Sequence, residues 1–391
     1  MTISMSVAAL GRYGAVASLS LLLAGAVAPT SQARTRPSTH PGPPPTVAEK
    51  QEGSAGGWRG WADAGEPPLR GTALGINAGG LMFEGSDATV AGRLRSTAGM
   101  GARVLRFDAS WSGVEPLGPI GGRDPVRRFG SLDRQVLGAA RAGLRPLLVV
   151  GYGTPWATSD GGVFTTPSDP ATFARFASAV AARYASSSAI WRDNGVAAPA
   201  GGVLYEIWNE PNAEFFLRDQ QTAPQRYATL LLLAQRAIRS ADPGARITVG
   251  GLVPVGAARF LAGVLRAEPA LRREVDAIGW HPYERTAAAV VRITRQFRRT
   301  LDALGLASVP LDITEIGWSE EEIPEPRRSR ELERALTGLQ APGLGVGLLV
   351  PFVALDRAGP GSYGLWRTTG EATESVDAFA RVARRAAGRR R

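Results

Sequence analysis

The chain has 391 residues, 44% of them hydrophobic and 20% charged, a composition typical of a globular protein with a sizeable core rather than a disordered chain. It contains no cysteine, which excludes disulfides, thiolate zinc sites and cysteine nucleophiles. His40 and His281 are the only histidines, so a metal site built from several histidines is excluded as well. We expect no metal and no organic cofactor.

The net charge of +10 could indicate a nucleic-acid partner, but the distribution of the charge does not favour one. Lys50 is the only lysine, and arginine is spread along the whole chain. We therefore expect no nucleic-acid partner. Arginine is concentrated only at 381–391, a pattern that favours a solvated helix face with a frayed end; an acidic cell-wall polymer stays open as a partner.

The N-terminus has the pattern of an export signal. An apolar stretch at 13–28 follows Arg12 and precedes small residues, and it is shorter than the roughly 20 residues of a membrane-spanning helix. We predict a signal peptide at 1–33, secretion or retention in the cell envelope, and no stable membrane insertion after cleavage. Because the leader carries a single positive charge, an uncleaved anchor is the alternative.

Residues 34–57 are rich in Pro, Ser, Thr and Gly and are predicted to form a disordered linker before one domain at 58–388. In that domain short apolar runs alternate with helical patterns, which is typical of repeated βα units. Eight strands are predicted, at 72–78, 103–109, 145–152, 202–210, 246–252, 275–283, 309–318 and 346–355. Eight such units close naturally into a (β/α)₈ (TIM) barrel, with an open doubly wound sheet as the alternative.

Helical spacing fills the gaps between these strands. Phe173, Phe176, Val180 and Tyr184 lie on one apolar face, and Asp169 before Pro170 predicts the N-cap and first position of that helix. The same spacing recurs at 227–238 and at 290–304. We interpret these apolar faces as core.

Two glutamates follow hydrophobic runs at the ends of predicted strands. Glu210 ends "YEIWNE" on the fourth strand and Glu315 lies in "DITEIGW" on the seventh. Functional residues of such barrels gather at the carboxyl ends of the strands, and glycosidic bond cleavage needs two carboxyl groups about 5 to 5.5 Å apart in retaining enzymes. The alternative is that both are solvated charges or partners of the many arginines.

The motifs "YEIWNEPN" and "ITEIGW" resemble the acid/base and nucleophile motifs of clan A glycoside hydrolases, most closely family 39. The resemblance extends from "RVLRFDASWSGVEP" to "YGLW". It implies a retaining hydrolase of a β-linked oligo- or polysaccharide, with a carbohydrate as partner. By position, Glu210 matches the acid/base, Glu315 the nucleophile, Asn209 the residue that binds the sugar 2-hydroxyl, and Arg106 an arginine that keeps the nucleophile ionised.

The resemblance also implies roles for residues around these two. His281 and Tyr283 in "WHPY" match a pair beside the carboxylates, in which the tyrosine donates to the nucleophile; a core histidine is the alternative. Phe352 stands where family members carry a tryptophan under the sugar. Three tryptophans that follow strand ends are candidates for stacking on sugar rings, with core packing as the alternative: Trp111, Trp156 and Trp318.

Glu206 alternates onto the same side of its strand as Glu210 but lies deeper, and we interpret it as a buried carboxylate paired with an arginine or water. Two other functions stay open. One is a non-catalytic glycan-binding barrel that kept the cleft and lost turnover, which the presence of both glutamates disfavours. The other is a basic envelope protein that holds an anionic polymer through its arginine-rich tail.

Overall fold

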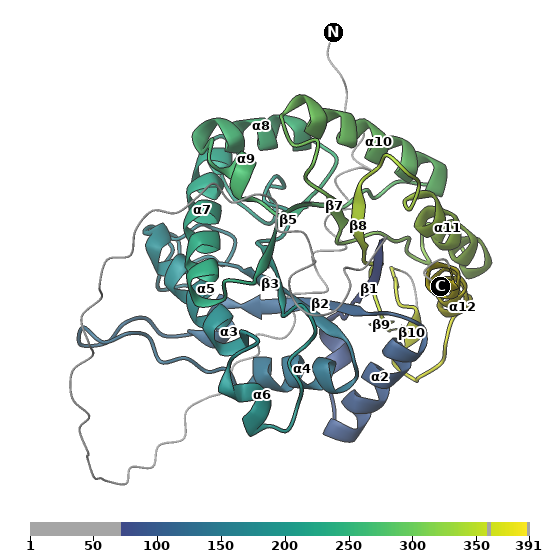
Figure 1. Ribbon diagram of the computed structural model, residues 1–391, viewed down its shortest axis with the longest axis horizontal. Coiled ribbons are helices and arrows are strands. Elements are labelled where there is room, and N and C mark those ends of the chain that lie inside the picture. Colours follow the sequence, from purple (N-terminus) through teal and green to yellow (C-terminus); the bar gives the residue numbers. More distant parts are fainter. Residues whose placement is uncertain (1–71, 358–360, 389–391) are drawn as a thin grey trace.

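The computed structural model describes residues 72–357 and 361–388. In this part of the chain, strands β1 to β8 are all parallel and close into a barrel in chain order, and helices surround it (Figure 1). The predicted (β/α)₈ barrel is confirmed, and the open doubly wound sheet is wrong. The predicted signal peptide, the linker and the first residues of the predicted domain lie outside the described residues.

The strands of the barrel are β1 (Ala73–Asn77), β2 (Val104–Ser110), β3 (Arg145–Gly151), β4 (Leu204–Ile207), β5 (Arg246–Leu252), β6 (Ala277–Trp280), β7 (Leu311–Ile313) and β8 (Val346–Leu349). The helices are η1 (Gly80–Phe83), α2 (Asp87–Gly99), α3 (Trp111–Val114), α4 (Gly130–Arg141), α5 (Pro170–Tyr184), α6 (Ala189–Asp193), α7 (Ala223–Ala241), α8 (Ala257–Ala267), α9 (Leu271–Glu274), α10 (Ala287–Ala303), α11 (Glu325–Gly338) and α12 (Glu374–Gly388). A short parallel pair, β9 (Leu355–Asp356) and β10 (Trp366–Arg367), follows β8.

All eight strands lie where the sequence predicts them, but several end earlier. The fourth was predicted to reach Glu210, whereas β4 ends at Ile207. Beyond it, Trp208 has a φ of 68° and Glu210 a φ of 44°, a left-handed backbone that cannot continue a strand and that side chains other than glycine rarely adopt. Such backbone strain is characteristic of functional sites.

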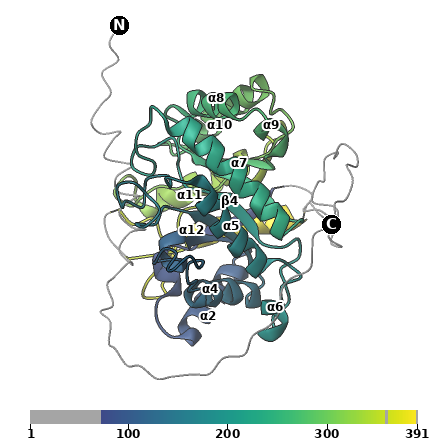
Figure 2. The same ribbon diagram turned by 90° about the vertical axis from the view of Figure 1, so that its left-hand side faces the viewer.

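Helix α5 begins as predicted. Asp169 is its N-cap and accepts a hydrogen bond from the amide of Ala171, Pro170 occupies the first turn, and Phe173 and Phe176 are buried. Helix α7 lies beside α5 (Figure 2) and contributes Tyr227 to the wall of the barrel.

Tyr227 connects β4 to β5 at the level of the site. Its hydroxyl donates to the carbonyl of Ile207 (2.7 Å) and accepts from the amide of Gly250 (2.9 Å). The register of β5 against β6 shifts between Val249 and Leu252, so the adjacent Gly251 amide is free to point at a side chain rather than along the ladder. Gly251 also has to be a glycine, since a Cβ atom there would overlap the ring of His281.

The C-terminal helix α12 packs against α11 on the outside of the barrel. Arg381 and Arg385 of α12 both pair with Glu333 of α11, at 2.8 and 2.9 Å. Two of the arginines of the tail thus hold the helix to the barrel, which weakens the interpretation of the tail as a polymer-binding surface. Among the described residues, no helix is both long and apolar enough to cross a membrane.

Candidate active site

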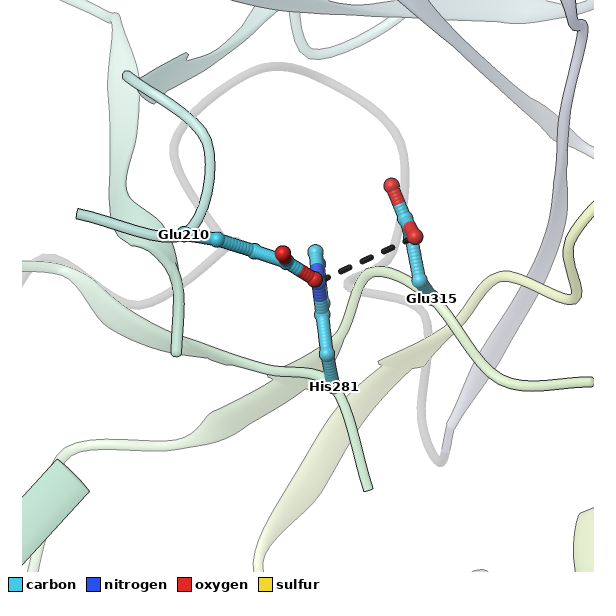
Figure 3. Close-up of side chains that lie close together, drawn as sticks. All are labelled: Glu210, His281 and Glu315. Carbon is cyan, nitrogen blue, oxygen red and sulfur yellow. Dashed lines mark hydrogen bonds and ion pairs between the residues drawn. The ribbon is translucent and has the colours of Figure 1, made fainter. Parts of the chain in front are cut away.

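The two predicted catalytic glutamates meet at one end of the barrel. Glu210 follows β4 and Glu315 follows β7, and both are buried, with 3% and 4% of their surface exposed. An oxygen of Glu210, an oxygen of Glu315 and a ring nitrogen of His281 all lie within 4.8 Å of one another (Figure 3). This separation is close to that of retaining glycosidases and well short of the roughly 6.5 to 9.5 Å of inverting ones.

Glu315 receives a donor on each oxygen. Arg106 Nη1 lies 2.7 Å from its Oε1, and the hydroxyl of Tyr283 donates to its Oε2 at 2.9 Å. Both contacts are those that the resemblance implies. A guanidinium and a hydroxyl that donate to the same carboxylate favour its ionised form.

Glu210 has a different neighbour. His281 Nδ1 lies 2.8 Å from Glu210 Oε1 and 3.8 Å from Glu315 Oε2 (Figure 3). Burial, and then the positive charge of Arg106, lower the pKa of His281 well below its usual value, so the ring is neutral. Among residues 72–357 and 361–388, Glu210 therefore has no cation in direct contact with its carboxyl group.

These surroundings separate the pKa values of the two carboxyl groups. Burial and then the charge of Glu315 raise the pKa of Glu210 well above its usual value. Burial raises the pKa of Glu315 too, but Arg106 and the Tyr283 hydrogen bond oppose that rise. When one proton is shared by the pair, it belongs to Glu210, because Glu315 is the better stabilised anion.

Arg106 organises the floor of the site. Its Nε donates to Glu206 Oε2 and its Nη2 to Asn209 Oδ1, each at 2.7 Å. Glu206 is fully buried, so the predicted buried carboxylate paired with an arginine is confirmed. Because the Asn209 oxygen is occupied by Arg106, the amide NH₂ group is what remains for a ligand. Burial alone would lower the pKa of Arg106, but Glu206 and Glu315 raise it above its usual value.

The four aromatic candidates have different environments. Trp111 has no exposed surface, stacks on Phe176 and donates to Glu115, so it is a core residue; its predicted contact with substrate is wrong. Trp156 is partly exposed and lies edge-on to Trp111. The other two are nearly buried: Trp318 donates to the carbonyl of Glu284, and Phe352 packs against Tyr363.

Three residues of the site were not anticipated. Thr314 is fully buried between His281 and Glu206. Asp108 is half-buried on β2, two positions after Arg106 on the same face of the strand, and makes no side-chain hydrogen bond to the described residues. Burial raises its pKa to about 6, against the effect of Arg106. Tyr152 follows β3 and is close enough to Asp108 for that carboxylate to raise its pKa further, after burial.

The cluster of Glu210, His281 and Glu315 offers three donor atoms that could also hold a divalent ion. One imidazole and two carboxylates is a plausible ligand set. Here, however, Glu315 is already paired with the Arg106 cation, and the raised pKa of Glu210 favours its protonated form, which is a poor ligand. The donor set therefore suits acid/base chemistry better than metal binding.

Fold and site together define a (β/α)₈ barrel with two buried carboxyl groups at the carboxyl ends of β4 and β7. The two groups differ in their pKa values, because only Glu315 is paired with Arg106. No protein-family model and no curated protein matches the chain.

Solved structures match its fold. A GH39 β-xylosidase from Caulobacter crescentus superposes with a TM-score of 0.59 at 20% identity, over 82% of this chain and 72% of that one. A GH39 enzyme from Xanthomonas axonopodis pv. citri gives 0.60 at 20%, over 81% and 67%. GH5_18 from Streptomyces cattleya, solved with GlcNAc, gives 0.62 at 16%, over 81% of each chain. At these identities the likeness establishes the shared fold.

Proposed function

We propose that this protein is a retaining glycoside hydrolase that cleaves a β-linked oligo- or polysaccharide, with Glu210 as acid/base and Glu315 as nucleophile. The observation that carries the proposal is the pair of buried carboxyl groups within 4.8 Å, one held by a cation and one by a neutral imidazole. The fold that it has in common with GH39 and GH5 proteins supports the same function.

In the first step the Glu315 carboxylate attacks the anomeric carbon, and the bond from that carbon to the glycosidic oxygen breaks. Glu210 turns its proton to the departing oxygen, which leaves as an alcohol. Arg106 and Tyr283 hold the Glu315 carboxylate in position for the attack. Their hydrogen bonds stabilise its negative charge without protonating it, so it remains a nucleophile. The product is a glycosyl ester of Glu315.

In the second step Glu210, now ionised, takes a proton from a water molecule. The oxygen of that water attacks the anomeric carbon, and Glu315 leaves as a carboxylate. Two inversions give a sugar with the configuration of the substrate. The pair returns to its starting state, with the proton on Glu210.

Several other side chains are proposed to hold the sugar. The NH₂ group of Asn209 donates to the 2-hydroxyl, and Asp108 and Tyr152 are polar groups of the barrel rim that carry no side-chain hydrogen bond to the described residues. Trp156, which is partly exposed, supplies apolar surface for stacking, whereas Trp318 and Phe352, with 3% and 6% of their surface exposed, offer little. Residues 1–33 are proposed to direct secretion, with 34–57 as the linker to the barrel.

The proposal is tested with purified protein on a panel of plant, fungal and bacterial polysaccharides, followed by mass analysis of the products. We expect shortened chains from at least one polysaccharide, and none from Glu315→Gln. Binding of a polysaccharide without any cleavage would instead indicate the non-catalytic glycan-binding barrel.

Metal removal is expected to leave catalysis unchanged. Prolonged dialysis against a chelator should not alter kcat/KM, because the residues that carry the reaction are a protonated acid and a carboxylate neutralised by arginine. The measurement is the rate on the best substrate before and after dialysis. Activity that falls in chelator and returns with a divalent ion would assign the Glu210, His281 and Glu315 cluster to a metal instead.

A further inference from the structure

Thr314 lies directly before the proposed nucleophile, and its side chain faces two buried polar groups. Its hydroxyl is 3.0 Å from Glu206 Oε1 and 3.0 Å from His281 Nε2. All three side chains have no exposed surface. The direction of each hydrogen bond in this cluster can therefore be worked out from the donors and acceptors that these side chains bring together.

Glu206 determines the direction of the Thr314 hydroxyl. The carboxylate accepts from Arg106 Nε at 2.7 Å, from Arg106 Nη2 at 3.3 Å and from the amide of Gly251 at 2.8 Å. A carboxylate surrounded by donors is an acceptor, so the single hydroxyl hydrogen of Thr314 points at it. What Thr314 offers to His281 is then a lone pair, and His281 Nε2 must carry the hydrogen.

The other nitrogen of the ring follows from this assignment. The His281 imidazole is neutral, so with a hydrogen on Nε2 its Nδ1 has a bare lone pair. That lone pair lies 2.8 Å from Glu210 Oε1. Two acceptors at this distance repel each other, whereas a protonated Glu210 makes a hydrogen bond.

We propose that Thr314 is a positioning residue that fixes the hydrogen of His281 on Nε2, so that Nδ1 accepts the proton of Glu210 and holds this side chain in its acid form. The inference rests on the proposed function, since it explains how the acid is kept protonated before substrate binds. Gly251 supports the arrangement, because only a residue without a Cβ atom leaves room for the ring.

Other charged and titratable groups also act on Glu210 and His281 and have to be held constant in a test. They are Arg106, Tyr152, Glu206, Tyr283 and Glu315. Substitution of Thr314 changes none of these charges. An effect on the proton of Glu210 is therefore an effect of the hydrogen-bond direction.

The first test needs no substrate. With ¹⁵N-labelled histidine, NMR reports the protonation of each ring nitrogen, and the variant His40→Ala leaves His281 as the single histidine. We expect a neutral ring with hydrogen on Nε2 across roughly pH 5 to 8. In Thr314→Val, which has the same shape but no hydroxyl, the hydrogen should move to Nδ1; in Thr314→Ser it should stay on Nε2.

The second test uses the pH profile of kcat/KM. Loss of the Nε2 hydrogen lets Nδ1 donate to an ionised Glu210, which lowers the pKa of that side chain. The alkaline limb of Thr314→Val should therefore move about one pH unit to lower pH, and Thr314→Ser should restore it.

Two results would overturn the proposal. One is a wild-type His281 with hydrogen on Nδ1 or on both nitrogens, which the NMR experiment detects whether or not the protein hydrolyses a glycoside. The other is a Thr314→Val variant that is slower but has an unmoved alkaline limb, as expected from a structural role alone. Absence of any hydrolysis, with hydrogen on Nε2, would reject the proposed function and leave the assignment of His281 intact.

Discussion

Glu315→Gln is expected to lower kcat by roughly 10⁴- to 10⁶-fold on every substrate, polysaccharide or activated glycoside, since covalent attack is needed for all of them. Glutamine keeps the shape of the side chain and can still meet Tyr283 and Arg106, so the barrel should fold. Its amide cannot attack the anomeric carbon. The measurement is kcat on a nitrophenyl glycoside and on the best polysaccharide.

The matched control for this variant is Glu321→Gln, an exposed carboxyl group on the loop that follows Glu315. It removes the same charge from the same segment and should leave both rates unchanged. If Glu315→Gln kept even a tenth of the wild-type rate while remaining folded, the nucleophile would have to be another residue.

Glu210→Ala is expected to separate substrates by their leaving groups. Polysaccharide cleavage should fall by roughly 10²- to 10⁴-fold, because a sugar alkoxide leaves poorly without a proton. A dinitrophenyl glycoside should still react in a fast burst, because its leaving group needs no proton. Slow turnover should follow, since no base activates water for the second step.

Azide distinguishes the two roles further, since it attacks without losing a proton. It should speed the slow phase of Glu210→Ala and give a glycosyl azide with the configuration of the substrate. With Glu315→Ala, azide would have to take the place of the nucleophile, and the product should have the opposite configuration. The reverse pattern in the two variants would exchange the roles of Glu210 and Glu315.

The barrel could be predicted from the sequence because its pattern is repeated. Each strand is a short apolar run buried on both faces, and each helix has a period of 3.6, so local errors do not change the fold class. The ends of the strands were less predictable. The apolar run of the fourth strand continues through Trp208 and leads directly into Glu210. Its composition does not indicate that Trp208 and Glu210 have positive φ angles, which end β4 at Ile207.

The core of the site could also be predicted, because its residues lie on strands of the barrel or directly after them. Arg106, Asn209, Glu210, His281 and Glu315 all converge as expected. Trp111 follows β2 in the same way, but α3 turns it into the core beside Phe176. A position after a strand is therefore a better indicator of the site for polar residues than for aromatic ones. An aromatic side chain at such a position can pack in the core as well as line the site.

Thr314 and Asp108 show what position alone does not reveal. Thr314 stands in an apolar strand end, where a threonine is ordinary, and its role depends on contacts with Glu206 of β4 and with His281, which follows β6. Asp108 alternates with Arg106 on β2, which could have indicated that it faces the barrel interior. Its lack of a side-chain hydrogen bond to the described residues becomes visible only in three dimensions.

The most direct test of a two-carboxylate retaining mechanism is proton NMR of the first-formed product, recorded before the free sugar equilibrates its anomers. Double displacement through Glu315 predicts that the anomeric signal of a β-linked substrate appears first as the β-anomer and drifts to the mixture later. Initial appearance of the α-anomer would mean a single displacement by water and would contradict the assignment of Glu315 as nucleophile.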